Sequence, residues 1–437
     1  MTFNFNKDFL QEFSENVFLD VLWSNPFFHP KLNKILGYYL HDLSSSRSVF
    51  INISHSDLPT NSLEEIDVII LQKFEKIITI SEKKSLKFHN LNSTKIYDLQ
   101  IANGEQYQFE KMNFLNVPKK YYHSKRFFQY IPITKHIEYL QYKFQTIQDK
   151  IDLQEIKFSQ FKEDYVEAFY KLEINEISVS NFVLDSKYQK LMKSSCINDL
   201  GLLTSYNLYN PSLRPTINFQ NINLLNLSKN DNSRELIISR NGYLFEYDYK
   251  GFHLSILCKL LKYELKYGDV YTELFNEIHN TDYLELNDSQ HELIKNEFFQ
   301  IFFSESLESK YESKFLEKIF GFKKYLLNYF ETNGFIKSPF TKEIYYHESF
   351  STKNIFSIFF RICETELNVK TLLNIQGYLE DKLTKLIFYQ FDSFIIDWDK
   401  DDGKQVLKDL KNIIETEDSY NISIAFGKNF NAMKQIK

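Results

Sequence analysis

Short apolar runs alternate with polar turns between residues 45 and 100, for example in SVFINIS, IDVIILQ, KIITIS and TKIYDLQIA. Such alternation is typical of a small sheet with one or two helices, so this part of the chain is predicted to be an α/β domain. Between residues 135 and 195, apolar residues recur at intervals of three and four, which predicts helices. From residue 240 onward, strand and helix patterns are mixed, and no repeat or low-complexity linker marks a boundary.

A length of 437 residues with 43% hydrophobic residues predicts a folded protein of two or three domains. No apolar run approaches the roughly 18 residues of a membrane helix, and the segment MTFNFNKDFLQEFSENVF carries acids where a signal peptide has a basic end. We therefore expect a cytoplasmic location and no membrane partner. The three cysteines lack CxxC spacing, which argues against a disulfide framework or a structural zinc site, and buried free thiols are expected.

A net charge of −6 argues against a general nucleic-acid coat, but the charge is not evenly spread. The stretch from residue 111 to 136, KMNFLNVPKKYYHSKRFFQYIPITKH, contains no acid and interleaves basic residues with aromatic ones. Such a stretch suits a phosphate backbone and stacked bases, and a solvated loop leading into a helix is the alternative. The candidate nucleic-acid contacts here are Lys119, Lys120, Lys125 and Arg126.

Two aspartates interrupt strongly apolar segments. Asp248 ends the strand pattern of YLFEYDYKGFHLSIL, in which Gly251 marks the bend into a helix, and Asp392 lies at the predicted hairpin tip of IFYQFDSFIIDW. Two carboxylates about 4 Å apart would repel each other by about 4 kcal/mol at an effective dielectric of roughly 20. A divalent cation reverses the sign of that interaction, so the pattern indicates a metal site. Aspartates are also common in ordinary turns, which is the alternative.

Six segments follow one another from Arg214 toward the C-terminus: LRPTINFQNINLL, SRELIISRNGYLFEYDYKGFHLSIL, GDVYTELFNEI, HELIKNEFFQIFF, NIQGYLED and YQFDSFIID. Their order resembles that of the DNA polymerase I family, also called family A, over half of the chain. The positions that match the family's motifs are Arg214, Asn218, Gln220, Asn221, Asp248, Tyr249, Lys295, Phe299, Gln376 and Asp392. The resemblance implies an α+β fold, that of a right-hand polymerase with palm and fingers.

The resemblance also implies roles for these side chains. Asp248, Asp392 and the backbone carbonyl of Tyr249 would hold two Mg²⁺ ions, with Mn²⁺ as an alternative. Lys295 would face the phosphates of a nucleoside triphosphate, and Phe299 would lie against its sugar and base. The expected contacts with primer-template DNA are Arg214, Asn218, Gln220, Asn221 and Gln376. Of these, Arg214 and Gln376 would contact the minor-groove edge of the base pairs.

Each of these side chains also has an ordinary structural interpretation. Lys295 is also compatible with an exposed helix lysine, and Gln376 with an amide on a helix surface. Phe299 and Phe303 are also compatible with core positions of a chain rich in aromatic residues. Taken together with the two aspartates, the polymerase interpretation is favoured.

Several positions depart from the family's pattern. His253 replaces the Glu that screens out ribose, and Phe303 replaces the Tyr that this Glu would hydrogen-bond, so weak discrimination against ribonucleotides is expected. His291 stands in place of the fingers Arg that grips phosphate, and its charge is only partial near neutral pH. Phe391 and Ser393 replace the His and Glu that flank the second metal-binding Asp. These losses imply slow catalysis or none.

The predicted division has three parts: a degenerate exonuclease-like α/β domain at 1–134, a helical connector with a vestigial thumb at 135–213, and palm and fingers at 214–437, with the fingers at about 265–365. In the exonuclease-like part, the first strand is expected in SVFINISHSDLP. There Asn52 and Ser54 replace the family's metal-binding Asp-x-Glu, so no proofreading is expected. Only Asp185 to Leu213 remain for a thumb, which implies weak binding of duplex unless a protein partner replaces it.

The function that the sequence indicates is metal-dependent, template-directed DNA synthesis from a primer 3′ end, without proofreading, as in phage-like or mobile-element replication. One alternative is a polymerase-derived nucleic-acid-binding subunit with weak catalysis. Another is a nucleotidyltransferase that needs no template or copies RNA. The retained Asp248, Lys295 and Asp392 favour catalysis, whereas His291, Phe391 and the short thumb favour the binding subunit.

Overall fold

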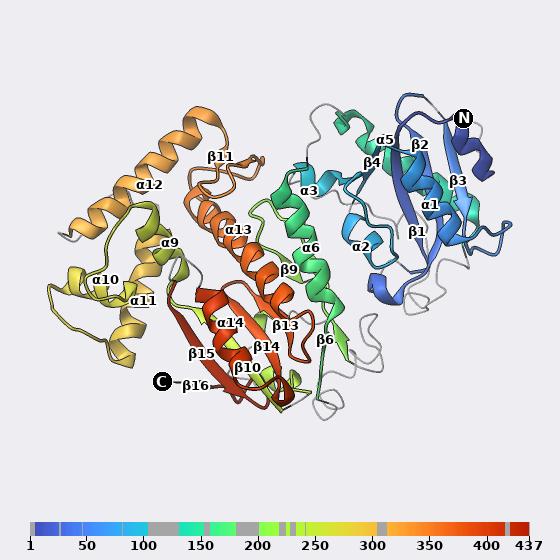
Figure 1. The fold of residues 1–437 in the computed structure, drawn as a ribbon. Helices are drawn as coiled ribbons and strands as arrows, with labels where there is room; N and C mark the ends of the chain where they lie inside the picture. Colours follow the sequence, from blue (N-terminus) through green and yellow to red (C-terminus); the bar gives the residue numbers. More distant parts are fainter. Residues whose placement is uncertain are drawn as a thin grey trace. The chain divides into compact units, whose positions relative to one another are not determined.

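A computed structural model describes residues 5–25, 28–45, 47–80, 82–103, 131–152, 158–180, 201–217, 224–227, 233–240, 242–303, 313–415 and 420–436 (Figure 1). The chain folds into two compact units. Unit 1 comprises Met1–Tyr209 and Thr216–Ile238, and unit 2 comprises Asn210–Pro215 and Ser239–Lys437. Each unit combines a sheet with helices, so the α+β class is confirmed, whereas the three-part division stays a prediction.

Unit 1 is built on a five-stranded sheet with the strand order β3-β2-β1-β4-β5. Its strands are β1 (Asn16–Trp23), β2 (Ile35–Asp42), β3 (Ser48–Asn52), β4 (Lys76–Thr79) and β5 (Ile96–Asp98). The first three pair antiparallel, and β4 lies parallel to β1 and to β5. Because side chains alternate along a strand, Val17 and Leu19 of β1 pack with helix α1 (Leu63–Lys73), while Phe18 and Leu22 pack with α5 (Ile133–Ile147). Both faces of the sheet are therefore covered.

The expected position of the first strand is wrong. Within SVFINISHSDLP, Ser48–Asn52 form β3, the third strand of the chain, at the edge of the sheet. Asn52 and Ser54 have structural roles there, since Asn52 Nδ2 donates to the carbonyl of His55 at 2.9 Å and Ser54 Oγ donates to the carbonyl of Ile35 at 2.8 Å. The sequence pattern missed β1 and β2 because both strands are almost wholly buried. Strands buried on both faces lack the alternation that identifies a half-exposed strand.

The described part of unit 1 also contains further helices and short strands. They are α2 (Lys83–Lys87), α3 (Leu99–Asn103), α6 (Gln160–Ile174), the paired strands β6 (Glu176–Ile177) and β7 (Leu202–Leu203), the paired strands β8 (Tyr206–Asn207) and β9 (Thr216–Ile217), and the 3₁₀ helices η1 (Lys7–Glu12), η2 (Pro30–Leu32), η5 (Gln148–Lys150), η6 (Leu224–Asn226) and η7 (Ser233–Leu236). The predicted helical spacing after residue 135 is confirmed by α5 and α6.

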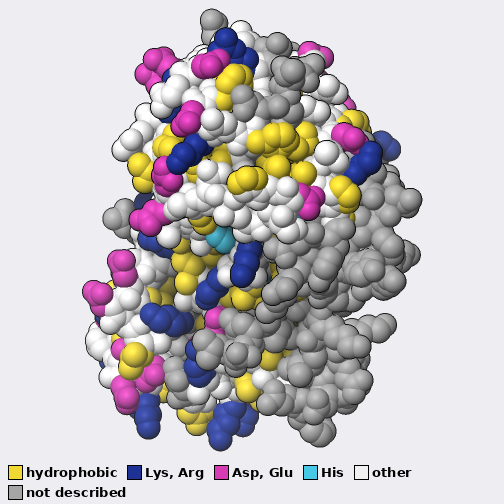
Figure 2. Space-filling model, turned by 90° about the vertical axis from the view of Figure 1, so that its right-hand side faces the viewer, with side chains coloured by type: hydrophobic (Ala, Val, Ile, Leu, Met, Phe, Trp, Pro, Cys, Tyr) yellow, Lys and Arg dark blue, Asp and Glu magenta, His cyan; other side chains and the backbone are white. Residues whose placement is uncertain are grey.

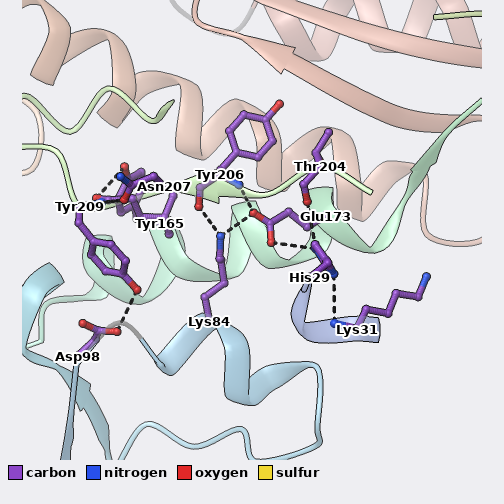
Figure 3. A network of polar contacts seen from close by, with 11 residues as sticks. His29, Lys31, Lys84, Asp98, Tyr165, Glu173, Thr204, Tyr206, Asn207 and Tyr209 are labelled. Carbon is purple, nitrogen blue, oxygen red and sulfur yellow. Dashed lines mark hydrogen bonds and ion pairs between the residues drawn. The ribbon is translucent and has the colours of Figure 1, made fainter. Parts of the chain in front are cut away.

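A buried polar network ties α6 to its neighbours within unit 1 (Figure 3). The carboxylate of Glu173 accepts a hydrogen bond from Lys84 Nζ at 2.6 Å and another from the amide of Tyr206. His29 Nδ1 accepts from the amide of Lys31, so its Nε2 is free to donate to the carbonyl of Thr204 at 3.1 Å. Because Glu173 is fully buried, its charge depends on these donors for compensation.

Unit 2 contains an antiparallel sheet with the strand order β13-β14-β10-β15-β16. Its strands are β10 (Gly242–Tyr249), β13 (Lys385–Gln390), β14 (Ser393–Asp399), β15 (Ile422–Gly427) and β16 (Lys434–Ile436). The predicted hairpin at 386–398 is confirmed, since β13 and β14 pair directly and only Phe391 and Asp392 lie between them. The predicted strand that ends on Asp248 is also confirmed, as β10 at the centre of the sheet.

Unit 2 also contains several helices, and most of them contact one long helix. They are α9 (Phe252–Leu260), α10 (Val270–His279), α11 (Asp288–Phe303), α12 (Lys314–Asn333), α13 (Ile355–Tyr378) and α14 (Gln405–Glu415), with the short strands β11 (Ile336–Lys337) and β12 (Ile344–Tyr345) and the 3₁₀ helix η8 (Lys400–Asp402). The long helix α13 contacts α9, α11, α12 and α14. In Figure 1, α10, α11 and α12 lie together to one side of the sheet of unit 2.

Some predictions fall on residues that the structure does not describe. Lys119, Lys120, Lys125 and Arg126 of the basic stretch lie outside the described residues, and so do residues 181–200 of the expected thumb and Cys196. The other two cysteines, Cys258 and Cys363, are buried free thiols, as expected. On the face that Figure 2 shows, basic and acidic side chains both occur among the described residues. No helix in the described part of the chain has the length and apolar character that crossing a membrane requires.

Candidate active site

The register of the unit 2 sheet brings the two predicted aspartates to the same end of neighbouring strands. Asp248 is paired with Ser393, the residue that directly follows Asp392. The amide of Tyr249 donates a hydrogen bond to the carbonyl of Asp392 at 3.0 Å. The hairpin tip therefore lies beside the end of β10, as the two apolar strand patterns predicted.

Gly251 makes the turn from β10 into α9. Its φ of 56° lies in the left-handed region, where a side chain is disfavoured. A Cβ atom at this position would also lie 2.7 Å from Cγ2 of Val270. The bend that the sequence located at Gly251 thus depends on glycine for two separate reasons.

The tip of the β13–β14 hairpin is strained and firmly held. Phe391 has a φ of 60°, which is uncommon for an aromatic residue. The carbonyl of Phe391 accepts a hydrogen bond from Asn368 Nδ2 at 2.6 Å, and the guanidinium carbon of Arg214 lies 3.7 Å from the centre of the Phe391 ring. Strained backbone persists where its surroundings enforce it, and it is concentrated at functional sites. These contacts hold the backbone that carries Asp392 in one conformation.

A cleft of about 780 Å³ opens over the two aspartates within unit 2. Eight of the predicted site residues line it: Arg214, Asp248, Tyr249, His253, His291, Lys295, Phe299 and Asp392. Arg361 and Glu364 of α13 line the same cleft and were not predicted. Cations, carboxylates and an exposed aromatic ring thus meet in a single cleft of the size of a small-molecule site.

The floor of the cleft accumulates negative charge. Burial raises the pKa of Asp392 to about 6, and the charge of Glu364 adds to the rise. Burial also raises the pKa of Tyr271 to about 12, with further contributions from Asp392, Asp269 and Asp248. The charges of Arg214 and His253 offset the rise in the pKa of Asp392 only in part, so a bound cation would further stabilise its ionised form.

The residues present fit a hard divalent cation such as Mg²⁺. The two aspartates offer carboxylate oxygens from adjacent strands, which are the ligands that Mg²⁺ prefers. Within the described residues, no group of three or more histidine, cysteine or acidic side chains suited to a metal is found. A cation held here would therefore complete its shell with backbone oxygens, water and the phosphates of a substrate, as Mg²⁺ commonly does.

Helix α11 presents a basic and aromatic face to the cleft. His291, Lys295 and Phe299 follow at four-residue intervals and therefore share one side of the helix. Phe299 is 46% exposed, so the alternative that it is a core residue is wrong. Its neighbours Phe298 and Phe302 are buried and form the core side of the helix. The side chain of Phe303, predicted to face the nucleotide, is outside the described part of the structure.

Glu364 of α13 is one of the two cleft residues of this helix that sequence reasoning missed, the other being Arg361. Glu364 is 1% exposed, its Oε2 accepts a hydrogen bond from His253 Nε2 at 2.6 Å, and its Oε1 lies 3.1 Å from Nε of Arg214. Burial alone would raise the pKa of Glu364, but the hydrogen bond from His253 and the charges of its basic neighbours lower it overall. The available signal was the presence of Arg361, Glu364 and Glu366 inside the mainly apolar segment IFSIFFRICETELNV, where a buried charge needs a partner.

The remaining predicted contacts with nucleic acid are not assembled around the cleft. Gln376 of α13 is 9% exposed and is not among the residues that line the cleft, so the alternative that it is a surface amide is wrong. Asn218, Gln220 and Asn221 lie outside the described residues. Their roles stay predictions.

Comparison with known proteins addresses the fold. Neither a family model nor a curated protein matches the sequence. Among solved structures, the chain is similar to the POL domain of Pol1 from M. smegmatis in complex with DNA primer-template and dNTP, with a TM-score of 0.65. The chain has the fold of a polymerase domain. Sequence identity to that protein is 10%, and the match covers 99% of this chain and 100% of the other. The predicted polymerase architecture is thus confirmed as a fold, whereas the exonuclease-like domain and the vestigial thumb stay predictions.

Proposed function

We propose that the chain is a metal-dependent nucleotidyltransferase that extends the 3′ end of a primer on a DNA template, using nucleoside triphosphates. The observation that carries the proposal is the meeting of Asp248 and Asp392 at one end of an antiparallel sheet, on the floor of a cleft that also holds Lys295 and Phe299. The similarity in fold to a polymerase domain supports it.

Asp248, Asp392 and the backbone carbonyl of Tyr249 would hold two Mg²⁺ ions, or Mn²⁺. When bound, such ions activate the primer 3′-hydroxyl and stabilise the departing pyrophosphate. Lys295 supplies a fixed positive charge toward the phosphates, and His291 lies one turn earlier on the same helix face. Phe299, a residue that is 46% exposed, would offer an apolar surface to the base and sugar.

The proposal includes the absence of proofreading and weak selection between deoxyribose and ribose. The absence of proofreading is an expectation from the sequence, and the weak sugar selection rests on His253, which stands in the cleft where the resembled family has an acidic residue. A protein partner that replaces the thumb belongs to the proposal as well, and so do a cytoplasmic location and a role in phage-like or mobile-element DNA replication.

A second candidate function is a nucleic-acid-binding subunit with weak catalysis. It is favoured by the state of Arg214, whose guanidinium group lies on the Phe391 ring and beside Glu364. An arginine engaged in this way is less available to a primer terminus. His291, a weaker cation than arginine near neutral pH, favours the same candidate.

The test is a nucleotide-incorporation assay that separates the candidates. Purified protein is given a labelled primer, alone or annealed to DNA or RNA template, with each nucleotide type and either Mg²⁺ or Mn²⁺. Extension that depends on a DNA template supports the proposal, extension of the primer alone or on RNA supports a transferase of another kind, and tight binding of primer-template without extension supports the binding subunit.

A further inference from the structure

A row of aromatic rings runs along α12 and onto the hairpin of β11 and β12. Tyr325 and Tyr329 lie one helical turn apart, with their ring centres 6.3 Å from each other, and the ring of Phe335 follows at 5.8 Å from that of Tyr329. Tyr325 is 61% exposed. In Figure 1, β11 lies beside the upper end of α12, so the row passes from the helix to the hairpin within unit 2.

The hairpin extends this row with exposed apolar side chains and a lysine. Lys337 of β11 is paired with Ile344 of β12, so their side chains lie on the same face of the hairpin. Ile344 is 57% exposed and Tyr346 is 63% exposed, whereas Tyr345 between them is buried. We call the surface that these exposed residues form with the row of rings the aromatic face. Its members are Tyr325, Tyr329, Phe335, Lys337, Ile344 and Tyr346.

The hairpin is held firmly from its buried side. The carboxylate of Glu366 on α13 accepts hydrogen bonds from three hydroxyl groups of the hairpin, those of Tyr345 at 2.7 Å, Thr341 at 2.6 Å and Ser338. Glu366 is buried, and a buried carboxylate without such donors would be costly. The outer side chains of the hairpin are therefore presented on a fixed support, which reduces the entropy lost when a partner binds.

The composition of the aromatic face favours a nucleic acid over a protein as its partner. Exposed apolar surface of this kind marks an interaction site, but the cores of protein interfaces are depleted in lysine. Lys337 lies within the face, and among the described residues its ammonium group has no hydrogen bond or ion pair. The loop of the hairpin adds the exposed Lys342 and one acid, Glu343. Aromatic rings interleaved with lysine suit a single strand, because bases stack on the rings and phosphates pair with the cations.

We propose that the aromatic face binds a single-stranded polynucleotide, with bases stacked on Tyr325 and Tyr346 and a phosphate paired with Lys337. None of these three residues lines the cleft over the two aspartates, so the aromatic face is a separate site. The inference goes beyond the proposed function and does not rest on it, because a single strand can be held here whether or not the cleft extends a primer.

The experiment measures binding of a fluorescein-labelled oligothymidylate to the full chain by fluorescence anisotropy, with EDTA present and no nucleotide. The variants are Tyr325→Ala, Tyr346→Ala and Lys337→Gln, together with Tyr325→Phe, which keeps the ring. Tyr142→Ala is the matched control, because Tyr142 is an exposed tyrosine on α5 of unit 1. A blunt duplex of the same length is the second ligand, since its bases are already stacked on one another.

Tyr325→Ala and Tyr346→Ala should each weaken binding of the single strand about tenfold, as the loss of one base–aromatic contact implies. Tyr325→Phe and Tyr142→Ala should bind as wild type does. Lys337→Gln should reduce the slope of log affinity against log salt concentration by about 0.7, which corresponds to one phosphate contact on a single strand. Wild-type affinity in both alanine variants would overturn the proposal in favour of a protein partner for this face. An equal loss of affinity for the blunt duplex, or no binding of the single strand by wild type, would overturn it as well.

Discussion

Acid pH should weaken divalent-cation binding in the cleft because Asp392 must lose its proton to act as a ligand. Burial raises the pKa of Asp392 to about 6, and the charge of Glu364 adds to that rise. The carboxylate is fully formed well above pH 6 and is lost as the pH falls through that value. One unit below its pKa only about a tenth of the carboxyl is ionised, so the apparent affinity for a cation should fall about tenfold.

Binding of Mn²⁺ to the protein alone, without nucleic acid or nucleotide, tests this expectation. Titrations followed by electron paramagnetic resonance at pH 5, 6, 7 and 8 and constant ionic strength give the dissociation constant at each pH. Affinity should be flat above pH 7 and decline below pH 6. Glu364→Gln removes a neighbouring negative charge and should move the midpoint to lower pH, whereas Asp401→Asn, which alters an exposed carboxylate outside the cleft, should not. A wild-type midpoint near pH 4, or the same midpoint in wild type and Glu364→Gln, would refute the reasoning.

Three further predictions concern the stability of unit 1 and the nucleotide contacts of unit 2. Glu173→Leu leaves the buried Lys84 without its carboxylate partner and should destabilise unit 1 by about 3–5 kcal/mol. The loss is measured by urea unfolding, followed by the fluorescence of Trp23 in a Trp398→Phe background. The double change with Lys84→Met should recover most of that loss, and no recovery would contradict the account. Burial raises the pKa of Asp67 to about 6, so the folded state is destabilised progressively as the pH rises from about 4 to 6. Asp67→Asn should therefore stabilise the folded protein by about 1–3 kcal/mol at pH 7 and by little at pH 4. An equal gain in stability at both pH values would argue against this reasoning. Lys295→Ala should raise the nucleotide KM about tenfold with unchanged primer-template affinity, whereas the matched Lys324→Ala on an exposed face of α12 should not.

Local sequence patterns were sufficient for the elements that carry the two aspartates. β10, the bend at Gly251 and the β13–β14 hairpin each follow from residues close in sequence, namely a strand pattern interrupted by a carboxylate or a glycine. The four-residue spacing of Lys295 and Phe299 likewise placed both on one helix face. These predictions needed only the periodicities of a strand and a helix.

Features that depend on contacts distant in sequence were not predicted. His253 and Glu364 are 111 residues apart, and nothing in either local segment indicates that they bond. β1 and β2 were missed because burial on both faces removes their alternation. The exposure of Phe299 and the burial of Gln376 also depend on how whole helices pack, since the same residue type suits either environment.

The central claim is that Asp248 and Asp392 together hold the metal ions of a polymerase reaction. Its most direct test is single-nucleotide extension of a DNA-templated primer in Mg²⁺ by wild type, Asp248→Asn, Asp392→Asn and the control Asp401→Asn, each checked for a melting temperature no lower than that of wild type. The account predicts extension by wild type and by Asp401→Asn, with a loss of at least about a hundredfold in each of the two cleft variants. Extension by Asp392→Asn at the wild-type rate, or none by folded wild-type protein in any divalent cation, would contradict it.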